Sequence, residues 1–140
     1  MTQRAITALA VALLIACAAL SGLLEAMLVP VRAGTVIVPV SVVLAVLTNV
    51  GLPVLAWWAA RATVAAVLPF AAWVVVVLLL SQSRPEGDVL LPGGKTGLTY
   101  VSYGLLLAGF ISGIATIARL SSRSAARSRA ADRTSRAAGE

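Results

Sequence analysis

The chain has 140 residues, of which 60% are hydrophobic and only 11% are charged. Soluble domains average about 25% charged residues, so this composition indicates an integral membrane protein and excludes an ordinary soluble domain. The net charge is +6, there is no histidine, and the single cysteine cannot form an internal disulfide or a thiolate metal site. We therefore expect no cofactor and no bound metal, and the basic charge favours an anionic membrane surface over nucleic acid as a partner.

Four apolar runs, each long enough to cross a bilayer, divide the chain. They cover about residues 5–29, 35–57, 62–80 and 97–118. A helix that rises ~1.5 Å per residue needs about 20 residues to cross the ~30 Å hydrocarbon core. The predicted fold is therefore all-α, an up-and-down bundle of four transmembrane helices within residues 1–119, followed by a basic tail at 120–140.

The first run contains Glu25, the only acidic residue within a span. An ionised carboxylate in hydrocarbon costs several kcal/mol, so Glu25 is a functional candidate. It lies four residues before Val29, about 6 Å from the outer end of the run. We expect a structural pairing with a residue of similar depth, and a proton- or cation-coupled role is the alternative. The candidate partners are Arg32, Arg84, Tyr100 and Tyr103.

Residues 14–17, Leu-Ile-Ala-Cys, also fit the pattern of a lipoprotein signal, which would lipidate Cys17 and leave three spans. A signal core gives way to polar sequence, whereas this run continues for twelve residues beyond Cys17. We therefore expect Cys17 to be a small buried apolar residue.

The second run contains Asn49, on the half that the predicted topology places inside. We expect its amide to hydrogen-bond a neighbouring helix, and we place it too far from Glu25 to share a site. The third run is followed by the only sizeable loop, whose residues 84–88 read Arg-Pro-Glu-Gly-Asp and have the composition of a turn. Arg84, Glu86 and Asp88 are candidates for contact with an external partner, and a solvated turn is the simpler interpretation.

Small residues follow the last run at a spacing of four, which lets helix backbones approach closely. The set comprises Gly104, Ala108, Ser112 and Thr116, together with Gly109 and Gly113 as a G-x-x-x-G pair. The first run has a similar pattern of alanine and glycine. We expect the first and fourth spans to supply the tightest contacts, either to each other or to a partner chain. In one interpretation the small residues only let a single four-helix bundle close. In the other, Gly109 and Gly113 mediate oligomerisation.

Six arginines follow the last span: Arg119, Arg123, Arg127, Arg129, Arg133 and Arg136. Basic residues beside a span stay in the cytoplasm, so both termini are predicted to be cytoplasmic. The tail has no large apolar residue beyond Leu120. It is therefore predicted to be disordered, with its arginines held against the anionic inner leaflet.

The loop pattern R-P-E-G-D-x-x-x-P at 84–92, the turn Val-Pro-Val-Arg-Ala-Gly at 29–34 and the early Pro39 carry a resemblance. Over about residues 5–118 the chain resembles an uncharacterised family of small actinobacterial membrane proteins. The resemblance implies a four-span protein of the cytoplasmic membrane, and the family has no assigned activity to transfer.

Two functions follow from these observations. The first is a non-enzymatic accessory or scaffolding component that packs with itself or with a partner membrane protein, because no nucleophile–base pair or metal cluster is visible. The alternative is a small transporter that uses Glu25, since four spans with one carboxylate in the first resemble the plan of small multidrug-resistance exporters. The predicted depth of Glu25 argues against it, because transporter sites lie near the midplane.

Overall fold

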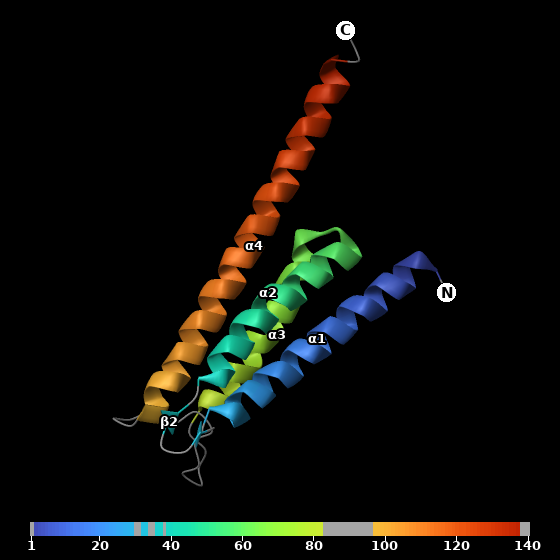
Figure 1. Ribbon diagram of the computed structural model, residues 1–140. Helices are drawn as coiled ribbons and strands as arrows, with labels where there is room; N and C mark the ends of the chain where they lie inside the picture. Colours follow the sequence, from blue (N-terminus) through green and yellow to red (C-terminus); the bar gives the residue numbers. More distant parts are fainter. Residues whose placement is uncertain (1, 30–31, 34–35, 38, 83–96, 138–140) are drawn as a thin grey trace.

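The computed structural model describes residues 2–29, 32–33, 36–37, 39–82 and 97–137. It contains the helices α1 (Gln3–Leu28), α2 (Val40–Ala60), α3 (Thr63–Ser81) and α4 (Gly97–Ala137). All four are long and apolar enough to cross a membrane, which confirms the all-α fold of a multi-pass membrane protein. Consecutive helices run in opposite directions, so both termini lie at the same end of the bundle (Figure 1).

A short hairpin separates α1 from α2. Its strands are β1 (Arg32–Ala33) and β2 (Val36–Ile37), which pair antiparallel with Arg32 opposite Ile37. Helix α2 therefore begins at Val40 and not at the predicted residue 35. Pro39 stands directly before it with φ −79, and a proline at a helix start sacrifices no helical hydrogen bond because its missing N–H would be unpaired there.

Helices α2 and α3 are joined by a tight reversal. Arg61 adopts a left-handed conformation with φ 53, and its backbone N–H donates to the carbonyl of Trp57 at 2.7 Å. This ends α2, and α3 begins two residues later at Thr63. The Arg61 guanidinium lies 5.1 Å from the centre of the Trp58 ring. An exposed Trp–Arg pair of this kind is typical of the headgroup level of a membrane.

The helices pack around α2, which contacts α1, α3 and α4, while α1 also packs extensively on α3. Helices α1 and α4 flank the α2–α3 hairpin and diverge toward the end that carries the termini (Figure 1). Tight packing of the first and fourth spans against each other, the first of the two alternatives, is therefore wrong, and contact with a partner chain stays a prediction. Gly22, Gly109 and Gly113 instead face large side chains of α3.

Trp73 of α3 fills the centre of the bundle between Gly22 of α1 and Gly109 of α4. A Cβ at Gly22 would approach Trp73 to 3.3 Å, and a Cβ at Gly109 would come within 2.6 Å of its Cζ2 atom. Gly113 likewise makes room for the ring of Phe70, which stacks on Trp73 with centroids 6.4 Å apart. The G-x-x-x-G pair thus serves packing within one chain.

Cys17 is exposed on α1, so the expectation of burial is wrong. The helical register explains the difference, because the inward face of α1 consists of Ala18, Gly22, Glu25 and Ala26. Cys17 precedes the first of these by one residue, about 100° around the helix, and faces away from the bundle.

The tail is also different from its prediction. Residues 120–137 are not disordered but continue α4 beyond the bundle. Alanine and arginine are strong helix formers, and the span supplies an existing helix end, so no new nucleation is needed. The hydroxyl of Ser124 donates back to the Leu120 carbonyl at 3.0 Å, as serine does within a helix.

Candidate functional site

The carboxyl group of Glu25 joins three helices in the core of the bundle. It is fully buried, with 0% of its surface exposed. Its Oε1 accepts hydrogen bonds from the hydroxyls of Ser21 and Thr48, each at 2.7 Å. Its Oε2 accepts one from the indole Nε1 of Trp73 at 2.6 Å. One side chain of α1 therefore holds both α2 and α3.

The partners of Glu25 lie in the middle of their helices. Trp73 is ten residues after Thr63 and eight before Ser81, the ends of α3. Thr48 is eight residues after the start of α2 and twelve before its end. Glu25 itself lies near the end of its own helix, as predicted, because α1 ends at Leu28, whereas its partners lie further from the ends of α2 and α3. A residue count along α1 measures the distance to the end of α1, whereas the neighbouring helices extend further.

The partners expected from the sequence are not those in the structure. Tyr100 and Tyr103 are 79% and 57% exposed on α4 and do not contact Glu25. The side chains of Arg32 and Arg84 lie outside the described residues. Two signals were available in the sequence: a serine four residues before Glu25 shares its helix face, and a mid-span tryptophan N–H requires an acceptor.

Asn49 borders the same part of the core. It is 2% exposed, and its Nδ2 donates to the Ala45 carbonyl of its own helix at 2.9 Å, where a neighbouring helix was expected. Together with Thr48 and Trp73 it lines an interior space of about 150 Å³ that admits no water-sized sphere. The amide of Asn49 does not bond Glu25, but the adjacent Thr48 contacts the carboxyl directly, so Asn49 lies closer to Glu25 than its place in the sequence predicts.

This geometry is suited to holding helices together. A carboxyl group in hydrocarbon is costly unless it is hydrogen-bonded, and here three donors from three helices surround it. Within the described residues, no group of three metal-binding side chains occurs. The arrangement is a polar connection between three helices in a largely apolar core.

A second polar cluster fixes the beginning of the tail to the α2–α3 reversal. The indole Nε1 of Trp57 donates to the Ser124 hydroxyl at 3.3 Å, and the Thr63 hydroxyl lies 3.3 Å from the same oxygen. The Arg127 guanidinium lies 5.2 Å from the centre of the Trp57 ring. Leu120, only 3% exposed, packs beneath them.

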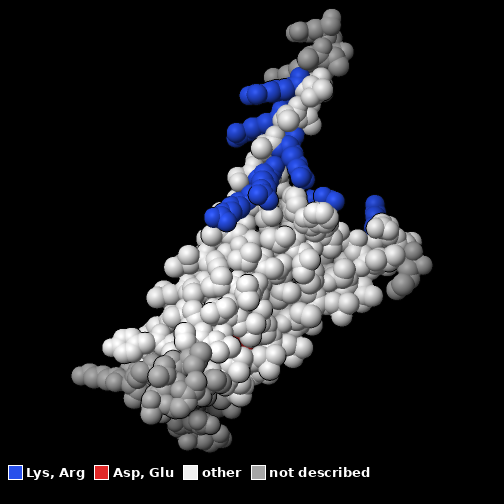
Figure 2. All heavy atoms as spheres, viewed as in Figure 1, with Lys and Arg blue, Asp and Glu red and all other residues white. Residues whose placement is uncertain are grey.

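The arginines of the tail share one face of its helix. At ~100° per residue, all six positions from 119 to 136 fall within one half of the helix circumference. Figure 2 shows Lys and Arg side chains gathered at this end of the molecule and projecting from the extended helix. The external loop candidates Arg84, Glu86 and Asp88 lie outside the described residues.

Residues 1–131 match the family described as "Family of unknown function (DUF6113)". The chain belongs to this family. The match agrees with the resemblance to an uncharacterised family and extends beyond it, since it includes most of the tail of this DUF6113 member. No curated protein and no solved structure matches the chain. For DUF6113, function must therefore be argued from the site and the surface.

Proposed function

We propose that this DUF6113 protein is a non-enzymatic accessory or scaffolding component that packs with itself or with a partner membrane protein. In the proposed topology it spans the cytoplasmic membrane with both termini in the cytoplasm. The topology is supported by Arg4 in the first turn of α1, Arg61 at the end of α2 and the tail arginines on α4, because these helix ends all lie toward the termini (Figure 1). Basic residues of this density are retained on the cytoplasmic side.

The observation that carries the proposal is the helix beyond the bundle. Residues 125–134 are exposed on every side, and the arginines occupy one face. An isolated helix of this length is marginal in water, so its contribution to stability inside the chain is small. A one-sided basic helix is instead suited to an anionic surface, either on a partner protein or on the inner leaflet.

The interior of the bundle supports the same proposal. Its one carboxyl group is already occupied by the hydroxyl and indole donors of Ser21, Thr48 and Trp73. Surface remains available along the outer side of α4, where Leu107 and Ile111 are 63% and 66% exposed. The actinobacterial source and a partner role for the 84–88 loop are further predictions from the sequence.

Site-specific photo-crosslinking in native membranes tests this function. A photoreactive residue replaces Ala130, which lies near the centre of the arginine face by helical register, and the matched control replaces Ser128 on the opposite face. Both positions are exposed. We expect one discrete protein adduct from position 130 and none from position 128. The proposal is overturned if neither position yields a protein adduct and native mass spectrometry of gently extracted nanodiscs shows only a monomer.

Transport is retained as a second candidate because Glu25 contacts the middle of α2 and α3, the depth at which transporter sites occur. Proteoliposomes decide between the two functions. For a scaffolding protein, wild type and Glu25→Gln carry no more proton or cation flux than empty vesicles, and only stability falls in the variant. Flux in the wild type that disappears in a folded Glu25→Gln protein would establish transport.

A further inference from the structure

A groove opens between α1 and the end of α2, on the side of the bundle that carries the termini. It has about 600 Å³ of open volume, within the ~300–1,000 Å³ typical of ligand-binding clefts. The groove exists because α1 diverges from the α2–α3 hairpin toward its N-terminus (Figure 1). Ala60, directly before the α2–α3 reversal, lines the opposite side of the groove.

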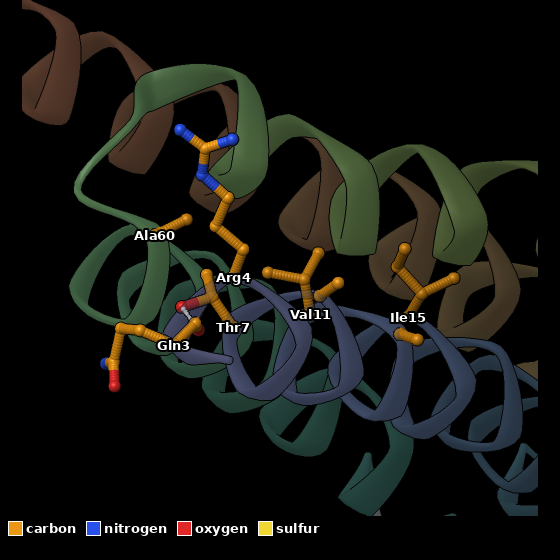
Figure 3. A pocket seen from close by; sticks show the side chains of 8 residues that line it. Gln3, Arg4, Thr7, Val11, Ile15 and Ala60 are labelled. Atoms are coloured by element: carbon orange, nitrogen blue, oxygen red, sulfur yellow. Dashed lines mark hydrogen bonds between the residues drawn. The ribbon is translucent and has the colours of Figure 1, made fainter. Parts of the chain in front are cut away.

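The lining changes character along the groove. Gln3, Arg4 and Thr7 surround the mouth, and Val11, Ala12 and Ile15 form the deeper wall. Figure 3 shows the Arg4 side chain extending from α1 across the groove toward the α2–α3 reversal. The Thr7 hydroxyl is engaged, since it donates to the Gln3 carbonyl at 3.1 Å. The guanidinium of Arg4 is the charged group that the lining presents to an occupant.

The dimensions of the groove match one leaflet of a bilayer. Residues 4 to 15 rise ~16 Å along α1, about half of the ~30 Å hydrocarbon thickness. The mouth is level with the end of α2, where Arg61 lies over the exposed Trp58 ring as expected of a headgroup-level pair. The cation is therefore placed at the depth of phosphate groups, and the apolar wall at the depth of acyl chains.

We propose that this groove binds one anionic glycerophospholipid, with its phosphate on Arg4 and an acyl chain along Val11, Ala12 and Ile15. The charge at the mouth selects the headgroup, because a cation near the membrane surface attracts anionic lipid. The apolar wall alone would accept any lipid tail, whereas the combination distinguishes anionic from zwitterionic lipids. This site is separate from the tail arginines and does not depend on the proposed scaffolding function.

Native mass spectrometry of the purified full chain tests the site, with phosphatidylglycerol or phosphatidylcholine of identical acyl chains as the probes. We expect one phosphatidylglycerol per chain to survive at collision energies that remove phosphatidylcholine. Arg4→Gln should weaken this retention about five-fold, which corresponds to ~1 kcal/mol for one cation at the surface. The matched control Arg129→Gln removes the same charge from the tail and should change retention less than about two-fold.

A second pair of variants tests the apolar wall. Ala12→Phe fills the groove and should abolish selective retention, whereas Ala71→Phe, at an exposed position of α3 that does not line the groove, should preserve it. Circular dichroism checks that each variant keeps its helical content. Equal retention of both lipids, or unchanged retention in Arg4→Gln and Ala12→Phe, overturns the proposal. A second copy of the chain cross-linked into the groove overturns it as well.

Discussion

Substituting Gly109 by alanine tests whether the core is organised around Trp73. The new Cβ would come within 2.6 Å of the Trp73 Cζ2 atom, a separation that requires the ring or the backbone to move. The ring is held on other sides by the Glu25 carboxyl and by the edge of Phe110, whose centroid lies 6.1 Å away. Overpacking at such a position costs ~1–3 kcal/mol.

Gly51→Ala is the matched control, because a Cβ at Gly51 meets nothing within 4 Å. Both substitutions gain about 1 kcal/mol from replacing glycine inside a helix. This gain cancels in the comparison, so the variants should differ in free energy of unfolding by the overpacking alone, about 1–3 kcal/mol. Gly51→Ala should be as stable as the wild type or more stable.

Unfolding in mixed micelles with increasing denaturing detergent, followed by circular dichroism, measures the difference. Trp73→Phe provides the second half of a cycle, since it removes the ring atoms that the new Cβ meets. The combination with Gly109→Ala should recover at least about 1 kcal/mol relative to the sum of the single effects. Equal stability of Gly109→Ala and Gly51→Ala would refute the packing argument and direct attention to an interface between chains.

Two further predictions concern the polar contacts. Thr48→Val keeps the shape of the side chain but removes the donor to Glu25, and should lower stability by about 0.6–1.7 kcal/mol in the same assay. Thr7→Val, whose hydroxyl bonds only its own helix, should stay within about 0.5 kcal/mol of wild type. Ser124→Ala removes the acceptor of the Trp57 indole N–H, and should loosen the docking of the tail and accelerate tryptic cleavage after Arg127. Ser128→Ala, at an exposed position, should leave the cleavage rate unchanged. Equal cleavage of the two alanine variants would contradict the docking role of Ser124.

The number and direction of the helices could be predicted from the sequence because span length is fixed by bilayer thickness. The same rule gives no information on which helices touch, since every span is apolar on most of its surface. The tightest contacts depend on where Trp73 and Phe70 insert their rings, and small residues only show that some ring is accommodated. The sequence pattern therefore predicts Gly109 as a packing position, but it does not predict that Trp73 is the side chain packed against it.

The site was predictable in part, because the sequence shows which residue needs partners but not which residues of other helices provide them. A carboxylate in a span requires donors, which predicts Glu25 as a site residue, and its position near the end of α1 favours partners near the outer surface. Its partners Thr48 and Trp73 are 23 and 48 residues away in the sequence, and their depth depends on how far each helix extends beyond α1. The lack of large apolar residues in the tail predicts disorder, but the tail is helical because a helix can be extended from an existing one.

The Glu25 connection also bears on how the protein is made. During synthesis α1 enters the membrane first, and its carboxyl then has only Ser21, on the same helix, as a donor. Thr48 arrives with the second helix and Trp73 with the third, so the charge is accommodated in steps as the chain emerges. Insertion of the α2–α3 hairpin therefore completes the hydrogen bonding of Glu25 before α4 closes over Trp73. The order of translation matches the order in which the core is assembled.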